Sequence, residues 1–238
     1  MSAARWLGVL GAAWLGTAGA GELATASSRS GMLEIRLGAY KPFIDREAAL
    51  SGARPYDTVF GDSPMLLGEL EMDWQLFQAF GSAGVGLSAG YAEKFGKSVT
   101  VGGDANAASE TTALKLIPLR LLGVYRFDVL AQRWNVPLVP YVKAGLVGQP
   151  WWSEKGGKQE YVNGLAAAGV KWGYQGTVGL SFLLDILEPR LARDFDTDLG
   201  VNHSYLFGEY SHVEVNNFGG KGLDLSSRHW MFGLALEY

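Results

Sequence analysis

The chain has 238 residues, of which 48% are hydrophobic and 18% charged, and its formal net charge is −4. It has no basic block, so nucleic acid is not an expected partner, and no cysteine, which excludes disulfides, thiol catalysis and cysteine-based zinc sites. Its 33 glycines and 12% aromatic residues are typical of strands and turns, and a single all-β barrel commonly has this length.

The N-terminal segment has the three parts of a secretory signal peptide. Arg5 supplies the positive charge, residues 6–16 form an apolar run, and small residues follow up to Ala20. We predict a signal peptide over residues 1–20, cleaved after Ala20, and a flexible leader over residues 21–30 of an exported chain. The alternative is an uncleaved membrane anchor, for which the apolar run is short.

Eight later segments alternate between apolar and other residues with a period of two, which predicts strands with two different faces. In chain order they are residues 31–40, 68–77, 82–93, 117–127, 137–147, 169–184, 202–213 and 229–238. Each is long enough to cross a bilayer as a tilted strand, and an even number of antiparallel strands closes without leaving an edge. The prediction is an all-β, eight-stranded antiparallel up-and-down transmembrane β-barrel over residues 31–238.

The connections between these segments alternate in length, as they do in outer-membrane barrels. Residues 78–81 and 128–136 are short, whereas residues 185–200 break the pattern and have the apolar spacing of a helix. The long, polar and glycine-rich connections are residues 43–63, 96–110, 148–165 and 216–224. With the N-terminus on the periplasmic side, the long connections are expected to be extracellular.

Alternation alone also fits a soluble, secreted ligand-binding barrel, in which the apolar face would point inward. Three features favour an apolar face toward lipid. The less apolar face of residues 82–93 consists of glycine and serine rather than charged residues. The chain ends on an aromatic residue in strand register, and other aromatic residues gather at strand ends. The expected aromatic girdle is Tyr91, Trp172, Tyr174, Tyr210 and Trp230 at the outer interface and Phe77, Tyr125, Phe127, Phe182 and Tyr238 at the inner one.

The polar face then becomes a lumen, where an unpaired charge would be costly. We expect an ion-pair network that closes this lumen, with the acidic residues of segment 68–77 facing Arg120, Arg126 and Lys143. The alternative is a small water-filled cavity with loosely paired charges. The expected members are Glu34, Arg36, Glu69, Glu71, Asp73, Arg120, Arg126, Lys143, Lys171 and Glu209.

Much of the chain also resembles a known family. The matching stretches are YKPFIDRE (40–47), VFG (59–61), GSAGVGLSAGY (81–91), YRFDVLAQRWNVPLVPYVKAGL (125–146), SFLLDILEP (181–189) and GVNHSYLFGEY (200–210). Together they resemble a family of small outer-membrane β-barrels of myxobacteria and relatives. The resemblance implies an outer-membrane barrel and brings no ligand or reaction with it.

Two short motifs could carry chemistry. His203 and Ser204 could be interpreted as a base and a nucleophile, as in an outer-membrane lipid hydrolase. Adjacent strand residues point to opposite faces, however, and these two lie at the periplasmic end.

Residues 194–198, DFDTD, resemble the start of a calcium loop, but Leu199 stands where the loop needs glycine and Tyr205 where it needs glutamate. We therefore predict no catalytic residues, no metal site and no cofactor.

The resulting functional prediction is an integral outer-membrane β-barrel protein, non-enzymatic, with a structural, adhesive or small-solute role through its extracellular loops. Its expected partners are outer-membrane lipids and the barrel assembly machinery, and any loop ligand is unknown. The assembly signal would be the last strand, with Trp230, Phe232, Leu234, Leu236 and Tyr238. The alternatives are the secreted soluble barrel and the lipid hydrolase.

Overall fold

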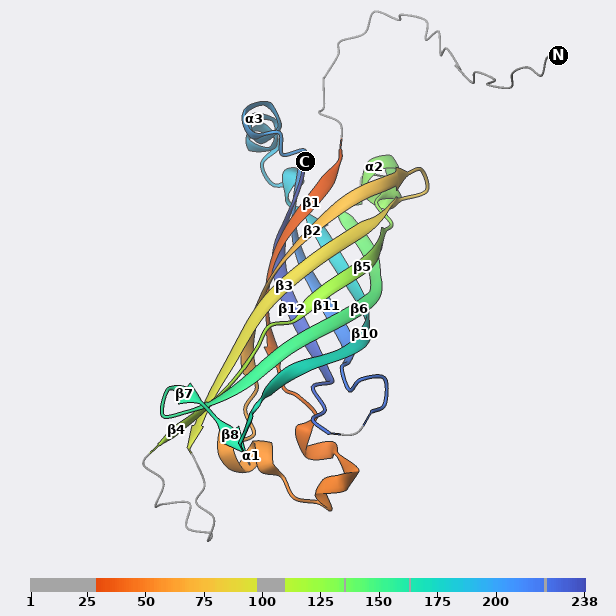
Figure 1. The fold of residues 1–238 in the computed structure, drawn as a ribbon. Coiled ribbons are helices and arrows are strands. Elements are labelled where there is room, and N and C mark those ends of the chain that lie inside the picture. The colour runs from red at the N-terminus through yellow and green to blue at the C-terminus, as the bar shows by residue number, and fades with distance from the viewer. Residues whose placement is uncertain (1–28, 98–109, 135, 163, 221) are drawn as a thin grey trace, which may run out of the picture.

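A closed antiparallel barrel dominates the computed structural model, which describes residues 29–97, 110–134, 136–162, 164–220 and 222–238 (Figure 1). The predicted signal peptide and most of the predicted leader lie outside these residues. The barrel strands are β1 (Gly31–Tyr40), β2 (Met65–Gln78), β3 (Ser82–Lys97), β4 (Thr111–Leu116), β5 (Leu119–Arg126), β6 (Leu138–Lys155), β10 (Ala168–Leu183), β11 (His203–Glu214) and β12 (Ser227–Glu237).

Strands β4 and β5 are two parts of one interrupted strand, because both pair with β3 on one side and β6 on the other. Each remaining strand pairs with its neighbours in the chain, and β12 pairs with β1 to close the ring. The prediction of an eight-stranded up-and-down barrel is therefore confirmed. The interruption falls at Ile117 and Pro118, where proline has no N–H to donate, yet the Gly90 N–H donates to the Pro118 carbonyl at 2.9 Å.

The wall extends further on one side than the sequence predicts. Residues 148–155, expected in a loop, continue β6, and β4 precedes the predicted segment 117–127. The alternation is lost there because Trp151 and Trp152 are both partly buried. Three short strands follow in this region, namely β7 (Lys158–Gln159), β8 (Tyr161–Val162) and β9 (Leu165–Ala166).

The helices lie at the two ends of the barrel. After β1 come η1 (Ile44–Arg46), η2 (Ala48–Leu50) and α1 (Pro55–Phe60), and the other end carries α2 (Val129–Trp134), η3 (Leu184–Ile186) and α3 (Pro189–Leu199). The C-terminus lies at the same end as α2 and α3, opposite α1 (Figure 1). The predicted helical turn in residues 185–200 is thus confirmed. None of the described helices is long and apolar enough to cross a membrane.

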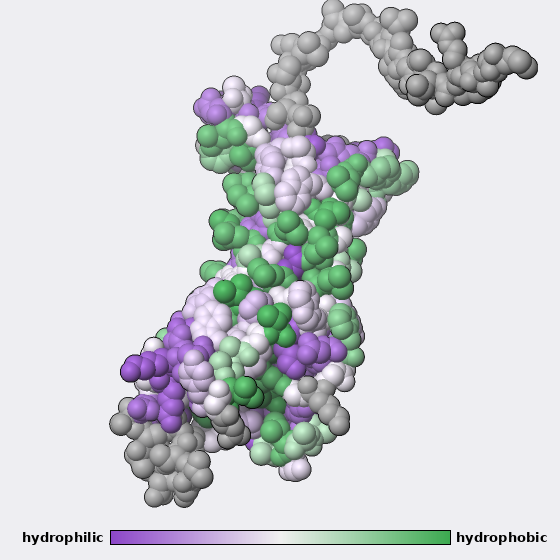
Figure 2. All heavy atoms as spheres, in the orientation of Figure 1, coloured by the Kyte–Doolittle hydropathy of each residue, from purple (hydrophilic) through white to green (hydrophobic). Residues whose placement is uncertain are grey.

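The two faces of the wall have the predicted orientation. Leu70 and Phe232 point outward and are 55% and 62% exposed, whereas Asp73 is 0% exposed inside the barrel. Figure 2 shows hydrophobic side chains gathered over the narrow middle of the molecule, between two more polar ends. This apolar outer belt identifies a transmembrane barrel and contradicts the alternative of a soluble barrel, whose apolar face would be inside.

The barrel interior has three layers along its axis. Its middle is charged, and apolar clusters lie on either side, which the sequence did not predict. The outer cluster, at the α1 end, contains Tyr40, Tyr56, Met65, Leu67, Ala92, Leu114, Leu116 and Met231. A smaller cluster of Val147, Val213, Val215 and Leu225 packs against Ile44 and Trp151, as the outer cluster does. The inner cluster, toward the termini, contains Met32, Val139, Tyr141, Tyr205, Phe207 and Ala235. Packed side chains therefore fill both ends of the lumen as well as its centre.

Candidate functional site

The charged middle layer begins with the register of β1 and β2. Successive strand residues alternate between faces, so Glu34 and Arg36 point inward together with every second residue of β2. Antiparallel pairing sets Glu34 opposite Glu71 and Arg36 opposite Glu69. One pair of neighbouring strands, β1 and β2, therefore supplies much of the buried charge.

Arg36 is the centre of this layer and is only 1% exposed. Its Nε donates to Glu69 at 2.9 Å, and one Nη2 hydrogen bond goes to Glu71. Nη1 lies 3.3 Å from both Glu34 and Glu209, and Nη2 also donates to Ser88 at 3.2 Å. A guanidinium has five N–H donors in a fixed plane, and Arg36 has five acceptors around it.

Three further cations complete what we call the ion-pair network. Lys143 Nζ lies 2.5 Å from both Glu34 and Glu71. Arg126 bridges Glu34 and Asp73, and Arg120 pairs with Glu69. The members of the network are Glu34, Arg36, Glu69, Glu71, Asp73, Arg120, Arg126, Lys143 and Glu209, and each is at most 5% exposed.

Lys171 is the one expected member of the charged lumen that lies apart from these pairs. It is buried in β10 opposite Gln149 of β6, nearer the outer end of the barrel. A further polar group lies at the inner opening of the barrel. There Glu237 accepts hydrogen bonds from Gln75 at 2.7 Å and Tyr205 at 3.1 Å, and it lies 3.5 Å from Arg29.

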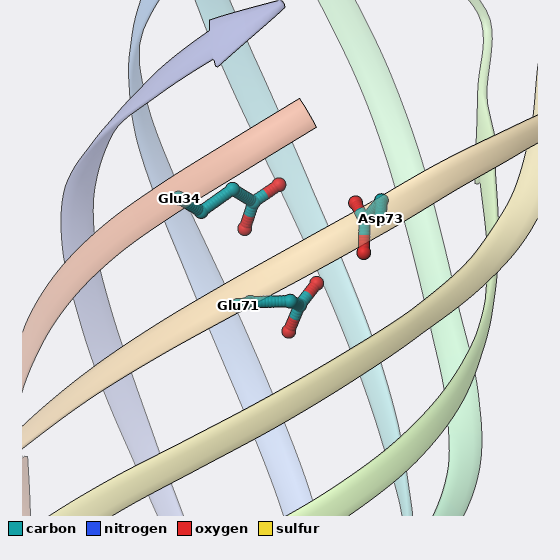
Figure 3. Close-up of side chains that lie close together, drawn as sticks. All are labelled: Glu34, Glu71 and Asp73. Carbon is teal, nitrogen blue, oxygen red and sulfur yellow. The ribbon is translucent and has the colours of Figure 1, made fainter. Parts of the chain in front are cut away.

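Carboxylate oxygens of Glu34, Glu71 and Asp73 lie within 4.8 Å of one another, close enough to hold a metal ion. Figure 3 shows the three side chains converging inside the barrel from β1 and β2. All three carboxylates already accept hydrogen bonds from Arg126 or Lys143. A cation would have to compete with these fixed positive charges, so the geometry favours an internal ion-pair network over a metal centre.

A tyrosine orients Glu209 within the network and packs over a glycine. The Tyr141 hydroxyl donates to Glu209 at 2.9 Å, and a Cβ at Gly179 would lie 2.2 Å from the Tyr141 ring. The missing side chain of Gly179 therefore makes room for Tyr141 in the lumen.

Gly179→Ala is expected to displace Tyr141 from Glu209 and to lower the free energy of unfolding by about 1–3 kcal/mol, as overpacking does. Gly176→Ala on the same strand is the matched control, because a Cβ there meets no atom within 4 Å. Urea unfolding followed by tryptophan fluorescence measures both variants. Equal stability of the two would show that Tyr141 is not fixed over Gly179.

The aromatic residues of the expected girdle are exposed or half-buried. At the outer end, the Tyr210 and Trp230 ring centroids are 5.2 Å apart. At the inner end, the Tyr125 hydroxyl donates to the Phe80 carbonyl beside the β2–β3 turn. The large exposed members are Phe77, Tyr91, Tyr125, Trp172, Tyr174 and Trp230, while Phe127, Phe182, Tyr210 and Tyr238 are half-buried.

The residues considered for hydrolysis have a structural role in this geometry. Asp185 of η3 accepts hydrogen bonds from the Ser204 N–H at 3.1 Å and the Ser204 hydroxyl at 3.2 Å, and lies 2.6 Å from His203 Nδ1. Burial opposes ionisation of Asp185, but His203 and the Ser204 N–H outweigh it and lower the pKa of this carboxyl. No hydrogen bond joins His203 to Ser204 in the described part of the chain, so the arrangement ties η3 to β11.

The segment that resembled a calcium loop is helical. Residues 194–198 lie within α3, which ends at Gly200 in the left-handed conformation at φ 68°. A calcium loop wraps its carboxylates around one ion, whereas side chains three and four residues apart on a helix are spread along one face. This segment is therefore the last part of an exposed helix rather than a calcium loop.

No protein-family model and no curated protein matches the sequence. Among solved structures, the chain is similar to Ail, the attachment invasion locus protein of Yersinia pestis, in complex with the heparin analogue sucrose octasulfate, with 12% identity and a TM-score of 0.44 over 88% of this chain and 97% of that one. OprG from Pseudomonas aeruginosa has 15% identity and a TM-score of 0.44 over the same shares, 88% and 97%. The N-terminal β-barrel domain of Pseudomonas aeruginosa OprF has 13% identity and a TM-score of 0.40 over 89% and 100%.

Ail and OprG are described as outer membrane proteins, and the matching part of OprF as a β-barrel domain. Their identities and TM-scores are too low to transfer a ligand or an activity to this chain. The assignment as a transmembrane barrel therefore rests on the closed strand pairing and the apolar outer belt described above.

Proposed function

We propose that this chain is a non-enzymatic outer-membrane β-barrel whose lumen stays closed and whose extracellular end carries its structural, adhesive or small-solute role. The observation that carries the proposal is the ion-pair network, in which five acceptors surround the guanidinium of Arg36. An eight-stranded barrel encloses only about enough space for its own side chains. Here charged side chains fill the middle and apolar clusters fill both ends.

Export by a signal peptide and assembly through β12 are part of the proposal. A signal peptide over residues 1–20 would direct the chain across the inner membrane, and the assembly machinery would recognise β12. That strand pairs with β1 from Glu237 to Met231, so it also closes the ring. Membership in the family of small myxobacterial outer-membrane barrels is part of this proposal and is supported by the sequence resemblance.

The extracellular end offers surfaces on which a partner could bind. A cavity of about 330 Å³ lies between α1, β4 and β6 and is lined by Tyr56, Phe60 and Trp151 among others. A second, more polar hollow of about 420 Å³ lies beside β1 and is lined by Lys41, Arg54 and Arg228 among others. These two hollows place both apolar and charged groups at the end where the long connections lie.

Recordings from planar phosphatidylcholine bilayers test the closed lumen. The folded protein is expected to give no steady current, because the buried ion pairs leave no aqueous path. Faster migration on gels before boiling confirms that the barrel is folded. The double variant Arg36→Ala and Lys143→Ala removes two central cations. It is expected to give a larger current than the unchanged protein. A large steady current from the unchanged, folded protein would contradict the proposal.

A further inference from the structure

Helix α3 has an apolar side that the barrel leaves uncovered. Of the α3 side chains that the structure describes, none is buried, and Leu199 is 68% exposed. Phe195 lies four residues before Leu199, on the same side of the helix, whereas Arg193 and Thr197 lie on the opposite side. An 11-residue helix is marginally stable in water on its own, so an apolar surface against Phe195 and Leu199 would stabilise α3 further.

The chain holds both ends of α3 in a fixed place. Before the helix, Asp185 joins η3 to the start of β11 through His203 and Ser204. After it, the Val201 N–H donates to the Phe195 carbonyl at 3.2 Å, and the Asn202 N–H donates to the Glu237 carbonyl of β12 at 2.7 Å. The helix is therefore fixed beside the last strand.

A groove separates α3 from the barrel wall. It has a volume of about 400 Å³, and most of its lining is apolar, including Leu187, Ala192, Phe195, Leu234 and Leu236, with Asp185, Glu188 and Ser204 as its polar members. Leu234 and Leu236 are outward-facing residues of β12, 54% and 38% exposed, and belong to the apolar belt. The apolar side of α3 is therefore continuous with the lipid-facing surface of the barrel.

We propose that α3 is an interfacial helix of the periplasmic leaflet, with Phe195 and Leu199 in the acyl-chain boundary and a phospholipid acyl chain in the groove against β12. Amphipathic helices lie in this way, with the polar face toward water and headgroups. Helix α3 carries two arginines and three aspartates, so apolar contact rather than attraction to anionic lipid would hold it. The inference goes beyond the proposed function but rests on membrane insertion of the barrel.

The absence of cysteine allows a direct test with single nitroxide labels. The variants are Leu199→Cys on the apolar side of α3, Thr197→Cys on its polar side and Leu234→Cys on the lipid-facing wall. Each is folded into phosphatidylcholine vesicles, and the label's collisions with oxygen, which partitions into lipid, are compared with those with a water-soluble nickel chelate. For the labels at 199 and 234, the ratio of oxygen collisions to chelate collisions is expected to be several-fold higher than for the label at 197. Adding phosphatidylglycerol to the vesicles is expected to leave this pattern unchanged.

Three other labelling results would each have a different meaning. Equal access of the chelate to labels at 199 and 197, with 234 still in lipid, would overturn the interfacial helix but leave the inserted barrel intact. A label at 199 shielded from both reagents would indicate a protein surface or a second copy over α3 and would also overturn the proposal. Water exposure at 234 would instead contradict the transmembrane barrel itself. Phe195→Cys repeats the test from within the groove.

Discussion

Arg36→Met is expected to lower the free energy of unfolding by about 3–5 kcal/mol, the cost of removing one partner from a buried ionic group. Methionine replaces the aliphatic stem of arginine but not its guanidinium, so the loss is mainly one of charge and hydrogen bonds. Glu34, Glu69, Glu71 and Glu209 all lie against the guanidinium. Their negative charges would then remain buried with too few cations. Urea unfolding of the folded barrel, followed by tryptophan fluorescence, measures the change.

Two further variants show whether this loss comes from the network. Arg228→Met removes an exposed arginine of β12 and is expected to change stability by less than about 0.5 kcal/mol, as most surface substitutions do. Adding Glu209→Gln to Arg36→Met removes one uncompensated carboxylate and should restore part of the lost stability. If Arg36→Met and Arg228→Met cost the same, Arg36 would not be the centre of a buried network.

Leu70→Arg is expected to destabilise the inserted barrel by about 2–4 kcal/mol, the cost of a charge near the middle of the bilayer on the lipid-facing side of a barrel. Leu70 points outward and lies opposite Ile35 of β1 and Ala89 of β3, near the middle of the wall. Unfolding from phosphatidylcholine vesicles measures the effect, because the cost arises only when acyl chains surround the barrel.

Leu76→Arg on the same strand is the matched control for depth. Leu76 is also exposed but lies near the end of β2 that carries the turn to β3. Its substitution is expected to cost only about 0–1 kcal/mol, because the charge can reach the interface. If both arginines were tolerated equally, water rather than lipid would surround the outer face of β2.

The sequence allowed the architecture to be predicted because one physical pattern repeats in every strand. Leu70 beside Glu69, and Phe232 beside Met231, alternate between two environments with the period of a strand. The alternation fails where both sides of a strand contact protein. The Trp151–Trp152 pair was therefore assigned to a loop, and the strand before Ile117 was missed.

The charged lumen could be predicted only as a set of residues. The alternation along the strand shows that Glu34 and Arg36 share a face. The pairing of opposite charges, however, depends on strand register and on which side chains meet across the lumen. The expected partners across the lumen did not include Arg36, although four glutamates lie against its guanidinium in the structure. The apolar layers were also missed, because an inward-facing Met32 or Phe207 looks like an irregularity in a polar face.

The layered interior explains why this barrel would need its charges paired. The apolar clusters restrict water at both ends, so the ion pairs lie in a poorly hydrated environment where an unpaired charge is costly. The same packing that satisfies the charges closes the lumen. Stability and lack of conductance therefore depend on the same residues in this account.

The most direct test of the central claim uses neighbouring residues of the last strand. Single cysteines replace Met231, Phe232, Leu234 and Ala235 in turn, and a lipid-soluble thiol reagent is applied to each barrel in vesicles. Phe232 and Leu234 face outward, whereas Met231 and Ala235 are each 1% exposed inside the barrel. The account predicts rapid modification at 232 and 234 and protection at 231 and 235. Protection at 232 and 234 with reaction at 231 and 235 would contradict it.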